Sequence, residues 1–215
     1  MNIQTPLFEG IDADDIPSMF SCLGAKTKSY QKDETIWHSG MAIHEIAVVA
    51  EGIVCIKAFD IWGKEGIIGM AGEGDLFGEA YACTGEPLRV DVVASSDCSV
   101  LFLELGKISQ PCGKACVFHS RLIANLLSIM AAKNLMLNRK IKDISPRTIK
   151  ERVLSYLERE AERQGSPSFA IPFSRQQLAD YLCVDRSALS ATLSSLEKEG
   201  IIYCNRNSFV IKGRS

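Results

Sequence analysis

The chain has little that would mark a secreted or membrane-spanning protein. Its first residues, MNIQTPLFEGIDADDI, hold neither a basic segment nor the apolar stretch of a signal peptide, so we expect no secretory signal. The densest apolar run, residues 122–137, is too short to cross a bilayer and is interrupted by Asn125, Lys133 and Asn134. We therefore expect a soluble, cytoplasmic protein without membrane contact, whose eight cysteines are mostly free thiols in a reducing environment.

Motifs of common enzymes are also missing. No nucleophile elbow, Walker loop or dinucleotide fingerprint occurs, and the glycine-rich string GMAGEGDLFGE lies between expected strands rather than before a helix. The three histidines, His38, His44 and His119, lack the spacing of a cupin-type metal site and do not suggest a haem ligand. We therefore expect no catalytic residues.

The net charge of -2 conceals an asymmetry between the two parts of the chain. From Arg139 onward there are 14 Lys and Arg against 9 Asp and Glu, a local charge of +5, and the first 138 residues carry -7. An excess of positive charge in one part of a chain favours contact with a polyanion there. If the protein binds a polyanion, we expect the C-terminal part to do so.

Residues from about Thr35 to Leu105 have the pattern of short strands separated by turns. Apolar and β-branched runs alternate with glycine-containing corners such as Glu51-Gly52, where tight turns need glycine. We expect strands at 45–52, 53–59, 65–70, 90–94 and 99–105. Many short strands with glycine turns are typical of an all-β barrel or jelly roll.

Beyond Pro111 the apolar period becomes helical and stays so from Cys112 to Ile141. One row follows alternating steps of four and three, as in a coiled-coil seam: Phe118, Leu122, Asn125, Ile129, Ala132 and Met136. A second apolar row lies on another face: Ile123, Leu127, Met130 and Leu137. A helix that is apolar on two sides must be covered twice, so we expect the β-domain on one side and a second copy of the chain on the other.

A further helix is expected after a break at residues 142–146, which we interpret as an interdomain hinge. Ser145 would cap this helix and Pro146 would occupy its first turn, where a missing N–H costs nothing. The helix should run to about Gln164 and end at Gly165-Ser166-Pro167.

The stretch SRQQLADYLCVDRSALSATLSSLEKEG, residues 174–200, predicts two helices joined by a tight turn. Ser174 is a good N-cap for a helix over 175–182, and Asp185 caps a second helix over 186–199 that Gly200 terminates. The following IIYCNRNSFVIK predicts two strands around residues 205–207. Helix, turn, helix and hairpin form a winged helix-turn-helix, whose second helix fits the major groove of DNA.

The outward face of this second helix carries residue types that recognise DNA rather than the Glu/Lys mixture of an ordinary solvated helix. Arg186 can donate a bidentate pair of hydrogen bonds to guanine, and Ser187 and Ser190 can donate or accept hydrogen bonds with base edges. Ala191 can contact a thymine methyl group. Contacts to DNA phosphates orient the protein on the duplex without reading the base sequence. We expect such contacts from Ser174, Arg175, Gln176 and the wing-tip Arg206. With the capping Asp185, these are the expected DNA-binding residues.

The order of a glycine-rich β-roll, a long helix and a winged helix-turn-helix resembles the Crp–Fnr superfamily of bacterial transcription regulators. The residues that carry the resemblance are GEGDLFGE (72–79), VVASSDCSVLFLE (92–104) and SRQQLADYLCVDRSALS (174–190). It implies an α+β fold whose N-terminal β-roll is a double-stranded β-helix, or jelly roll, like a cyclic-nucleotide-binding domain. The implied domains are an effector-binding β-roll at 1–110, a dimerisation helix at 111–142 and a DNA-binding domain at 143–215.

The same resemblance implies a mode of action. The homodimer is expected to bind an inverted-repeat operator in double-stranded DNA, with RNA polymerase as a further candidate partner. A small-molecule effector bound between β-roll and helix is expected to reorient the DNA-binding domains. Ala191 and Thr192 stand where relatives often carry a second Arg and an acidic or similar polar group, so we expect an operator that differs from the commonest half-site.

The candidate effector residues depart from the cyclic-AMP-binding pattern. In relatives that bind cyclic AMP, Gly-Glu holds the ribose and an Arg-Ser pair on the next strand holds the phosphate. Gly78 and Glu79 match the first pair, but Leu88 and Arg89 stand at the second, where a shift by one residue turns a side chain to the opposite face. We therefore expect an effector other than cyclic AMP, with Asn134 of the long helix as a further candidate contact.

The cysteines suggest one alternative mode of sensing. Iron–sulfur members of the superfamily carry an N-terminal cysteine cluster, and here only Cys22 lies near that end, so we expect no such cluster. Cys112 and Cys116 share a helical face, and in a dimer four thiolates could bind zinc or form a redox switch. Without a C-x-x-C motif we expect them to be small buried residues, and the redox- or metal-responsive regulator stays an alternative. A regulator acting mainly through protein contacts is the other.

Overall fold

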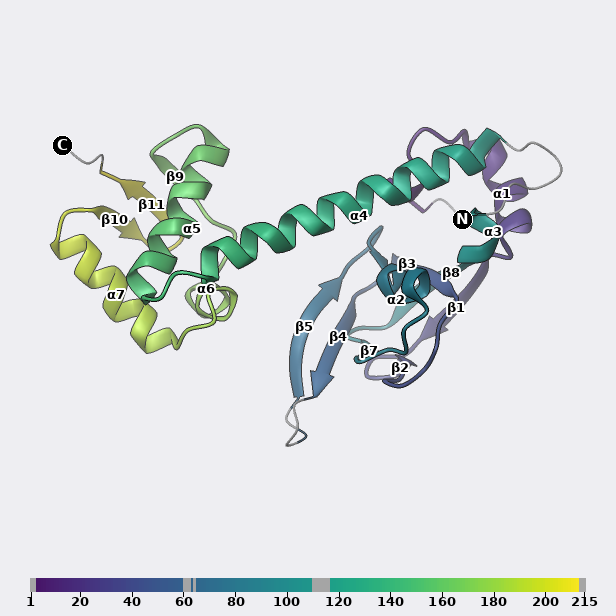
Figure 1. Cartoon of the computed structure of the whole chain (residues 1–215), viewed down its shortest axis with the longest axis horizontal. Coiled ribbons are helices and arrows are strands. Elements are labelled where there is room, and N and C mark those ends of the chain that lie inside the picture. Colours follow the sequence, from purple (N-terminus) through teal and green to yellow (C-terminus); the bar gives the residue numbers. More distant parts are fainter. Residues whose placement is uncertain (1–2, 60–62, 64, 110–116, 213–215) are drawn as a thin grey trace. The chain divides into compact units, whose positions relative to one another are not determined.

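The chain forms two compact units, residues 1–130 and 131–215. The computed structural model describes residues 3–59, 63, 65–109 and 117–212 (Figure 1). In that part of the chain no helix combines the length and the apolar character needed to span a membrane.

The first unit is built from two four-stranded antiparallel sheets. Their strand orders are β1–β8–β3–β6 and β2–β7–β4–β5. The strands are β1 (Lys26–Tyr30), β2 (Thr35–Trp37), β3 (Glu45–Glu51), β4 (Val54–Phe59), β5 (Glu65–Ala71), β6 (Leu76–Phe77), β7 (Asp91–Ala94) and β8 (Cys98–Glu104). Each strand expected from the sequence is present within a few residues. The sequence pattern missed β1, β2 and β6, because β1 is largely exposed, β2 has three residues and β6 has two.

Gly52 takes the chain from one sheet to the other. It follows β3 in the first sheet and precedes β4 in the second, with a φ of 84°. A Cβ atom at this position would collide with the carbonyl oxygen of Asp97. Both the backbone conformation and the close approach therefore require glycine at the turn expected at Glu51-Gly52.

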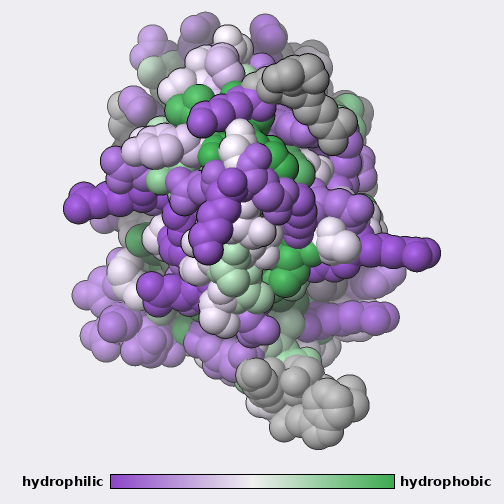
Figure 2. Space-filling view, turned by 90° about the vertical axis from the view of Figure 1, so that its left-hand side faces the viewer, coloured by the Kyte–Doolittle hydropathy of each residue, from purple (hydrophilic) through white to green (hydrophobic). Residues whose placement is uncertain are grey.

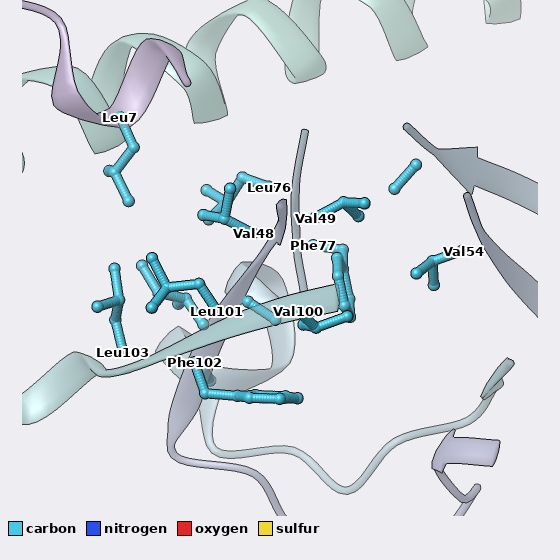
Figure 3. Close-up of a cluster of buried hydrophobic side chains, with 14 of the residues drawn as sticks. Leu7, Val48, Val49, Val54, Leu76, Phe77, Val100, Leu101, Phe102 and Leu103 are labelled. Atoms are coloured by element: carbon cyan, nitrogen blue, oxygen red, sulfur yellow. The ribbon is translucent and has the colours of Figure 1, made fainter. Parts of the chain in front are cut away.

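Apolar side chains from both sheets meet in one core (Figure 3). Trp37 makes edge contacts with Phe77 and Phe102, at ring-centroid distances of 5.3 and 5.6 Å. Val48 and Leu101, paired across β3 and β8, have no more than 1% of their surface exposed. Burial of these aromatic and aliphatic side chains supplies the main stabilisation of the β-roll, because it removes apolar surface from water.

Short helices flank this core. They are the 3-10 helices η1 (Pro6–Phe8) and η2 (Ala13–Asp15) and the α-helices α1 (Ile16–Leu23), α2 (Glu79–Thr84) and α3 (Leu105–Ser109). Gly24, in the left-handed conformation, terminates α1. The helix α2 follows directly from the FGE motif and was not expected from the sequence.

The long helix α4 (Val117–Ile144) covers the β-roll with one face. Phe118, Leu122 and Leu126 are buried in the core of the first unit. Asn125 lies on the same side and donates from Nδ2 to the carbonyl oxygens of Leu7 and Glu9, at 2.9 and 2.8 Å. The expected seam therefore begins against the chain's own N-terminal segment, which explains how a polar residue is accommodated in it.

Three of the four residues in the second apolar row of α4 are exposed, while Met130 is half-buried and packs against the core of the first unit. The exposed fraction of the residue surface is 37% at Ile123, 62% at Leu127 and 55% at Leu137. The expectation that α4 is apolar on two faces agrees with this pattern. The start expected at Cys112, and both Cys112 and Cys116, lie outside the described residues.

The helix α5 (Ile149–Gln164) begins three residues later than the sequence suggested. Thr148 is its N-cap: the Thr148 side chain accepts from the Glu151 amide at 3.2 Å, and the Glu151 carboxylate accepts from the Thr148 amide at 3.1 Å. Ser145 instead donates its hydroxyl to the carbonyl oxygen of Ile141, in the last turns of α4. The expected cap at Ser145 is therefore wrong, because this reciprocal capping box satisfies two amides at once.

The remainder of the second unit is a winged helix-turn-helix. It comprises β9 (Ser168–Ala170), α6 (Arg175–Tyr181), α7 (Arg186–Lys198), β10 (Ile202–Asn205) and β11 (Ser208–Ile211), with the sheet order β10–β11–β9. Leu178, Leu189, Leu193, Leu196 and Phe209 form a core in which each is no more than 2% exposed. Gly200 ends the α7 region with a φ of 72°. The expected α+β fold class is confirmed.

A buried carboxylate joins the end of α4 to α5 and α6. Asp143 is fully buried and accepts from Arg159 Nη2 at 2.7 Å, Tyr181 Oη at 2.9 Å and Ser155 Oγ at 3.4 Å. Arg159 also pairs with the buried Glu160 at 2.8 Å. Burial and the hydrogen bond to Asp143 raise the pKa of Tyr181 to about 12, so this hydroxyl remains a donor at neutral pH. The last turn of α4 is thus fixed to the helices of the second unit.

We predict that Asp143→Ala lowers the stability of the second unit by about 3–5 kcal/mol, because it leaves Arg159 half-buried without its main anion. Urea unfolding followed by circular dichroism measures this loss. Glu158→Ala is the matched control, since Glu158 is exposed on α5 and its removal should change stability by less than about 0.5 kcal/mol. Equal unfolding midpoints for the two variants would contradict a structural role for the Asp143 cluster.

Candidate nucleic-acid interface

A tight turn sets the position of α7 relative to α6. The backbone amides of Cys183 and Val184 donate to the carbonyl oxygens of Asp180 and Ala179, at 3.2 and 3.0 Å. Cys183 adopts a left-handed conformation with a φ of 54°. Ala179 is fully buried, and its small side chain permits close approach of the two helices. These local features fix the second helix as a separate, outward-facing element.

The packing of α7 determines which of its side chains face solvent. Its leucines point into the core, so the opposite face is exposed at Arg186, Ser187, Ser190 and Ala191. Figure 2 views the protein from the side of the C-terminal unit and shows a face dominated by hydrophilic side chains. The four residues expected to contact base edges are therefore together on one accessible surface of the first turns of α7.

Hydrogen-bond donors and acceptors on this surface are available to an external partner. Among the described residues, the Arg186 guanidinium has no hydrogen-bond or ion-pair partner, so its donors are free. Ser190 donates to the carbonyl oxygen of Arg186 at 2.9 Å and keeps its oxygen as an acceptor. Asp185 stands at the N-cap with extended backbone, but its side chain makes no capping hydrogen bond in this structure.

The N-terminus of α6 is organised by a second capping box. The Ser174 side chain accepts from the Gln177 amide at 3.3 Å, and the Gln177 side chain accepts from the Ser174 amide at 2.8 Å. Gln176 is exposed and donates to Asp180 at 2.8 Å. The sequence analysis predicts Ser174 as the N-cap but not the role of Gln177, although the S-x-x-Q spacing is the signal for such a capping box.

The wing is hydrogen-bonded to both α6 and α7. Arg206, at its tip, is exposed and adopts a φ of 51°. Arg175 donates from Nη2 to the carbonyl oxygen of Arg206 at 3.3 Å, and Glu197 of α7 accepts from the Cys204 amide at 2.9 Å. Burial raises the pKa of the Cys204 thiol, so it is a neutral side chain at physiological pH.

The candidate effector residues of the β-roll lie in contrasting environments. Gly78, with a φ of 81°, is the N-cap of α2, and a Cβ atom there would collide with the Trp37 ring. The next residue, Glu79, is buried, with 8% of its surface exposed. Leu88 is 2% exposed, whereas Arg89 is exposed. The hydrophobic side chain thus points into the β-roll and the cation points to solvent.

Two other sequence candidates belong to different surroundings. Asn134 is in the second compact unit, where its exposed side chain accepts from Asn138 at 2.8 Å. The Cys22 sulfur lies 3.8 Å from Nε2 of the buried His119. In the described part of the chain, no group of three or more metal-ligating side chains occurs. The cluster around Asp143 was not found from the sequence, because its members are up to 38 residues apart with no shared periodicity.

Comparison with known proteins agrees with this architecture. Residues 27–114 match the cyclic nucleotide-binding domain family, and residues 151–215 match the Crp-like helix-turn-helix domain family. The chain is 26% identical to the transcriptional activator protein FnrL of Cereibacter sphaeroides, over 86% of this chain and 75% of that protein. It is 25% identical to the cAMP-activated global transcriptional regulator Vfr of Pseudomonas aeruginosa, over 86% and 89%.

Solved structures show the same fold. The catabolite activator protein of Thermus thermophilus superimposes with a TM-score of 0.51 at 22% identity, over 97% of this chain and 94% of that one. A β-roll followed by a long helix and a winged helix-turn-helix defines a class of effector-controlled DNA-binding proteins. This chain belongs to the Crp–Fnr superfamily of transcription regulators. It is an effector-regulated DNA-binding regulator, and the curated relatives that it matches are regulators rather than enzymes.

We predict that Ser174→Ala lowers the stability of the second unit by about 1 kcal/mol, because it removes the acceptor of the capping box of α6. Urea unfolding of the full chain measures the effect. Ser187→Ala removes an exposed hydroxyl from the first turn of α7 and should leave stability within about 0.5 kcal/mol of the parent. A Ser174→Ala variant as stable as the Ser187→Ala variant would rule out a stabilising cap.

Proposed function

We propose that the protein is a homodimer that reads an inverted-repeat operator with the first turns of α7, under the control of an effector other than cyclic AMP. The observation that carries the proposal is the exposed Arg186 guanidinium, which has no partner among the described residues and stands in the first turn of the helix-turn-helix's second helix. Its position matches the geometry by which a recognition helix presents its N-terminal residues to base edges.

The proposed DNA contacts fall into two groups. Base-edge contacts are assigned to Arg186, Ser187, Ser190 and Ala191. Phosphate contacts are assigned to the helix and wing residues around them, namely Ser174, Arg175, Gln176, Asp185 and Arg206, with Asp185 acting through its backbone because a carboxylate repels phosphate. All of these residues except the half-buried Arg175 are exposed, and this exposure and the excess of positive charge from Arg139 onward support the division.

Dimerisation is proposed through α4. Its second apolar row leaves large side chains in water, including Leu127 and Leu137. Such a row along a 28-residue helix is stable in water when a second helix covers it. A two-fold dimer places two recognition helices on one DNA, which is why we propose an inverted repeat as the operator.

The proposed effector is a small molecule other than cyclic AMP. A cyclic nucleotide needs a cation facing its phosphate, and the two candidate positions do not fit, since Leu88 is buried and apolar while Arg89 is exposed to solvent. Gly78, with its positive φ, and the buried Glu79 stay candidate effector contacts, together with Leu88 and Arg89. Asn134 of α4 stays a candidate on the strength of the family resemblance alone. The chemical identity of the effector is left open.

We also propose domain limits and a setting. The effector domain comprises residues 1–110, the dimerisation helix 111–142 and the DNA-binding domain 143–215; the contacts of Asp143 with α5 and α6 support the last boundary. Because the partner is DNA, we propose the cytoplasm as the place of action and RNA polymerase as a further partner. Sensing by Cys112 and Cys116, and regulation mainly through protein contacts, are not favoured by the comparisons.

The operator for this test is a sequence obtained by selection from random duplex DNA. We predict that Arg186→Ala weakens binding to it by about 1–3 kcal/mol and relaxes the preference at one base pair, because the substitution removes a bidentate base contact. Fluorescence anisotropy with the operator and with single-base variants measures both effects. Lys198→Ala is the matched control: it removes the same charge from the far end of α7 and should keep base selectivity. Unchanged selectivity in Arg186→Ala would mean that another surface reads the DNA.

A further inference from the structure

Arg175 directs its guanidinium toward the wing rather than away from the protein. It is the first residue of α6 and is half-buried. One N–H of Nη2 donates to the carbonyl oxygen of Arg206 at 3.3 Å, and the guanidinium carbon lies 5.7 Å from the centre of the Phe209 ring. Phe209 is fully buried in the core of the second unit, so this ring provides a fixed platform for the cation.

The part of the wing held by Arg175 is conformationally demanding. Asn205 and Ser208 are paired at the ends of β10 and β11, and Arg206 occupies the turn between them with a φ of 51°. A side-chain-bearing residue in the left-handed region is uncommon and persists where surrounding contacts hold it. Two further hydrogen bonds anchor this strand pair: the Ile171 amide donates to the Asn207 carbonyl oxygen, and the Cys204 amide donates to the Glu197 carboxylate. Arg175 adds the contact at Arg206 itself.

We infer that Arg175 is a positioning residue: it holds the wing tip so that the Arg206 side chain is presented to DNA, and its contribution to binding passes through Arg206. This inference rests on the proposed DNA interface and refines the role assigned there to Arg175. The planar guanidinium can stack on a ring and donate in a fixed direction at once, which a lysine ammonium cannot do.

A double-mutant cycle tests the inference. Operator affinity and its salt dependence are measured for the parent, Arg175→Met, Arg206→Ala and the double variant. If Arg175 acts through Arg206, each single substitution weakens binding by a similar factor, about fivefold, and the double variant binds no more weakly than Arg206→Ala. The logarithmic salt slope should fall by about one in each single variant and by no more in the double variant.

Independent phosphate contacts would give a different result. The two affinity losses would then multiply, and the salt slope of the double variant would fall by about two. Arg175→Lys separates the models further, because a lysine keeps the charge for a phosphate but loses the stacked, directed contact. We expect Arg175→Lys to bind as weakly as Arg175→Met, and parent-like affinity in this variant would overturn the inference.

Two controls keep the outcome interpretable. Amide hydrogen exchange should accelerate at residues 205–207 in Arg175→Met while the α5 amides keep their protection, and unchanged exchange at 205–207 would count against positioning. If both Arg206→Ala and Arg186→Ala leave operator binding intact, the proposed interface itself is wrong. If those two variants weaken binding but the Arg175 and Arg206 effects multiply, only the positioning role fails.

Discussion

The burial of the leucine face of α7 is the constraint on which the DNA-binding unit depends. Leu189, Leu193 and Leu196 are each no more than 2% exposed and pack with Leu178 and Phe209. Removing such side chains from water contributes roughly 1.5–3 kcal/mol each, an upper estimate because unfolded chains already bury some apolar surface. Once this face is fixed inward, the helical period places Arg186, Ser187 and Ser190 on the outward face. The proposed recognition surface is thus a consequence of core packing.

Polar contacts determine how that core is connected to the rest of the chain. Asp143 attaches the last turn of α4 to Arg159 of α5 and to Tyr181 of α6. A buried charge cluster is a weak source of net stability but a strong constraint on geometry, because breaking it leaves an uncompensated charge. In the wing, backbone pairing holds β10 and β11 together, and the hydrogen bond from Arg175 to the Arg206 carbonyl oxygen constrains the geometry of the turn between them.

The features that sequence could predict are those with a local period or a short motif. Five of the eight strands of the β-roll, the two faces of α4 and the helix-turn-helix follow from apolar spacing and from glycine or capping residues. The fold class and the regulator function were reached from these, together with the resemblance of three motifs to one superfamily. The cap of α5 was misplaced because Ser145-Pro146 is an acceptable start in isolation, and only the pairing of Thr148 with Glu151 decides otherwise.

Features set by distant contacts were beyond the sequence. Nothing in the pattern pairs Asn125 with the carbonyl oxygens of Leu7 and Glu9, or Asp143 with Tyr181, because each pair depends on the tertiary arrangement of separate elements. The assignment of Arg175 to the DNA backbone illustrates the same limit, since composition indicates a cation near DNA but not the carbonyl oxygen it contacts. Side-chain direction, rather than element type, is what the structure adds to the candidate site.

The proposed function requires a dimer of this chain to bind a two-fold symmetric DNA sequence without cyclic AMP as its signal. The most direct test is selection from random duplex DNA by the purified, reduced protein, with and without cyclic AMP. The account predicts enrichment of an inverted repeat whose half-site centres lie about one helical turn apart, to the same degree in both samples. Enrichment only with cyclic AMP would contradict the interpretation of Leu88 and Arg89. Absence of any enriched sequence, from a protein that still binds DNA non-specifically at low salt, would contradict sequence-specific recognition by the effector-free dimer.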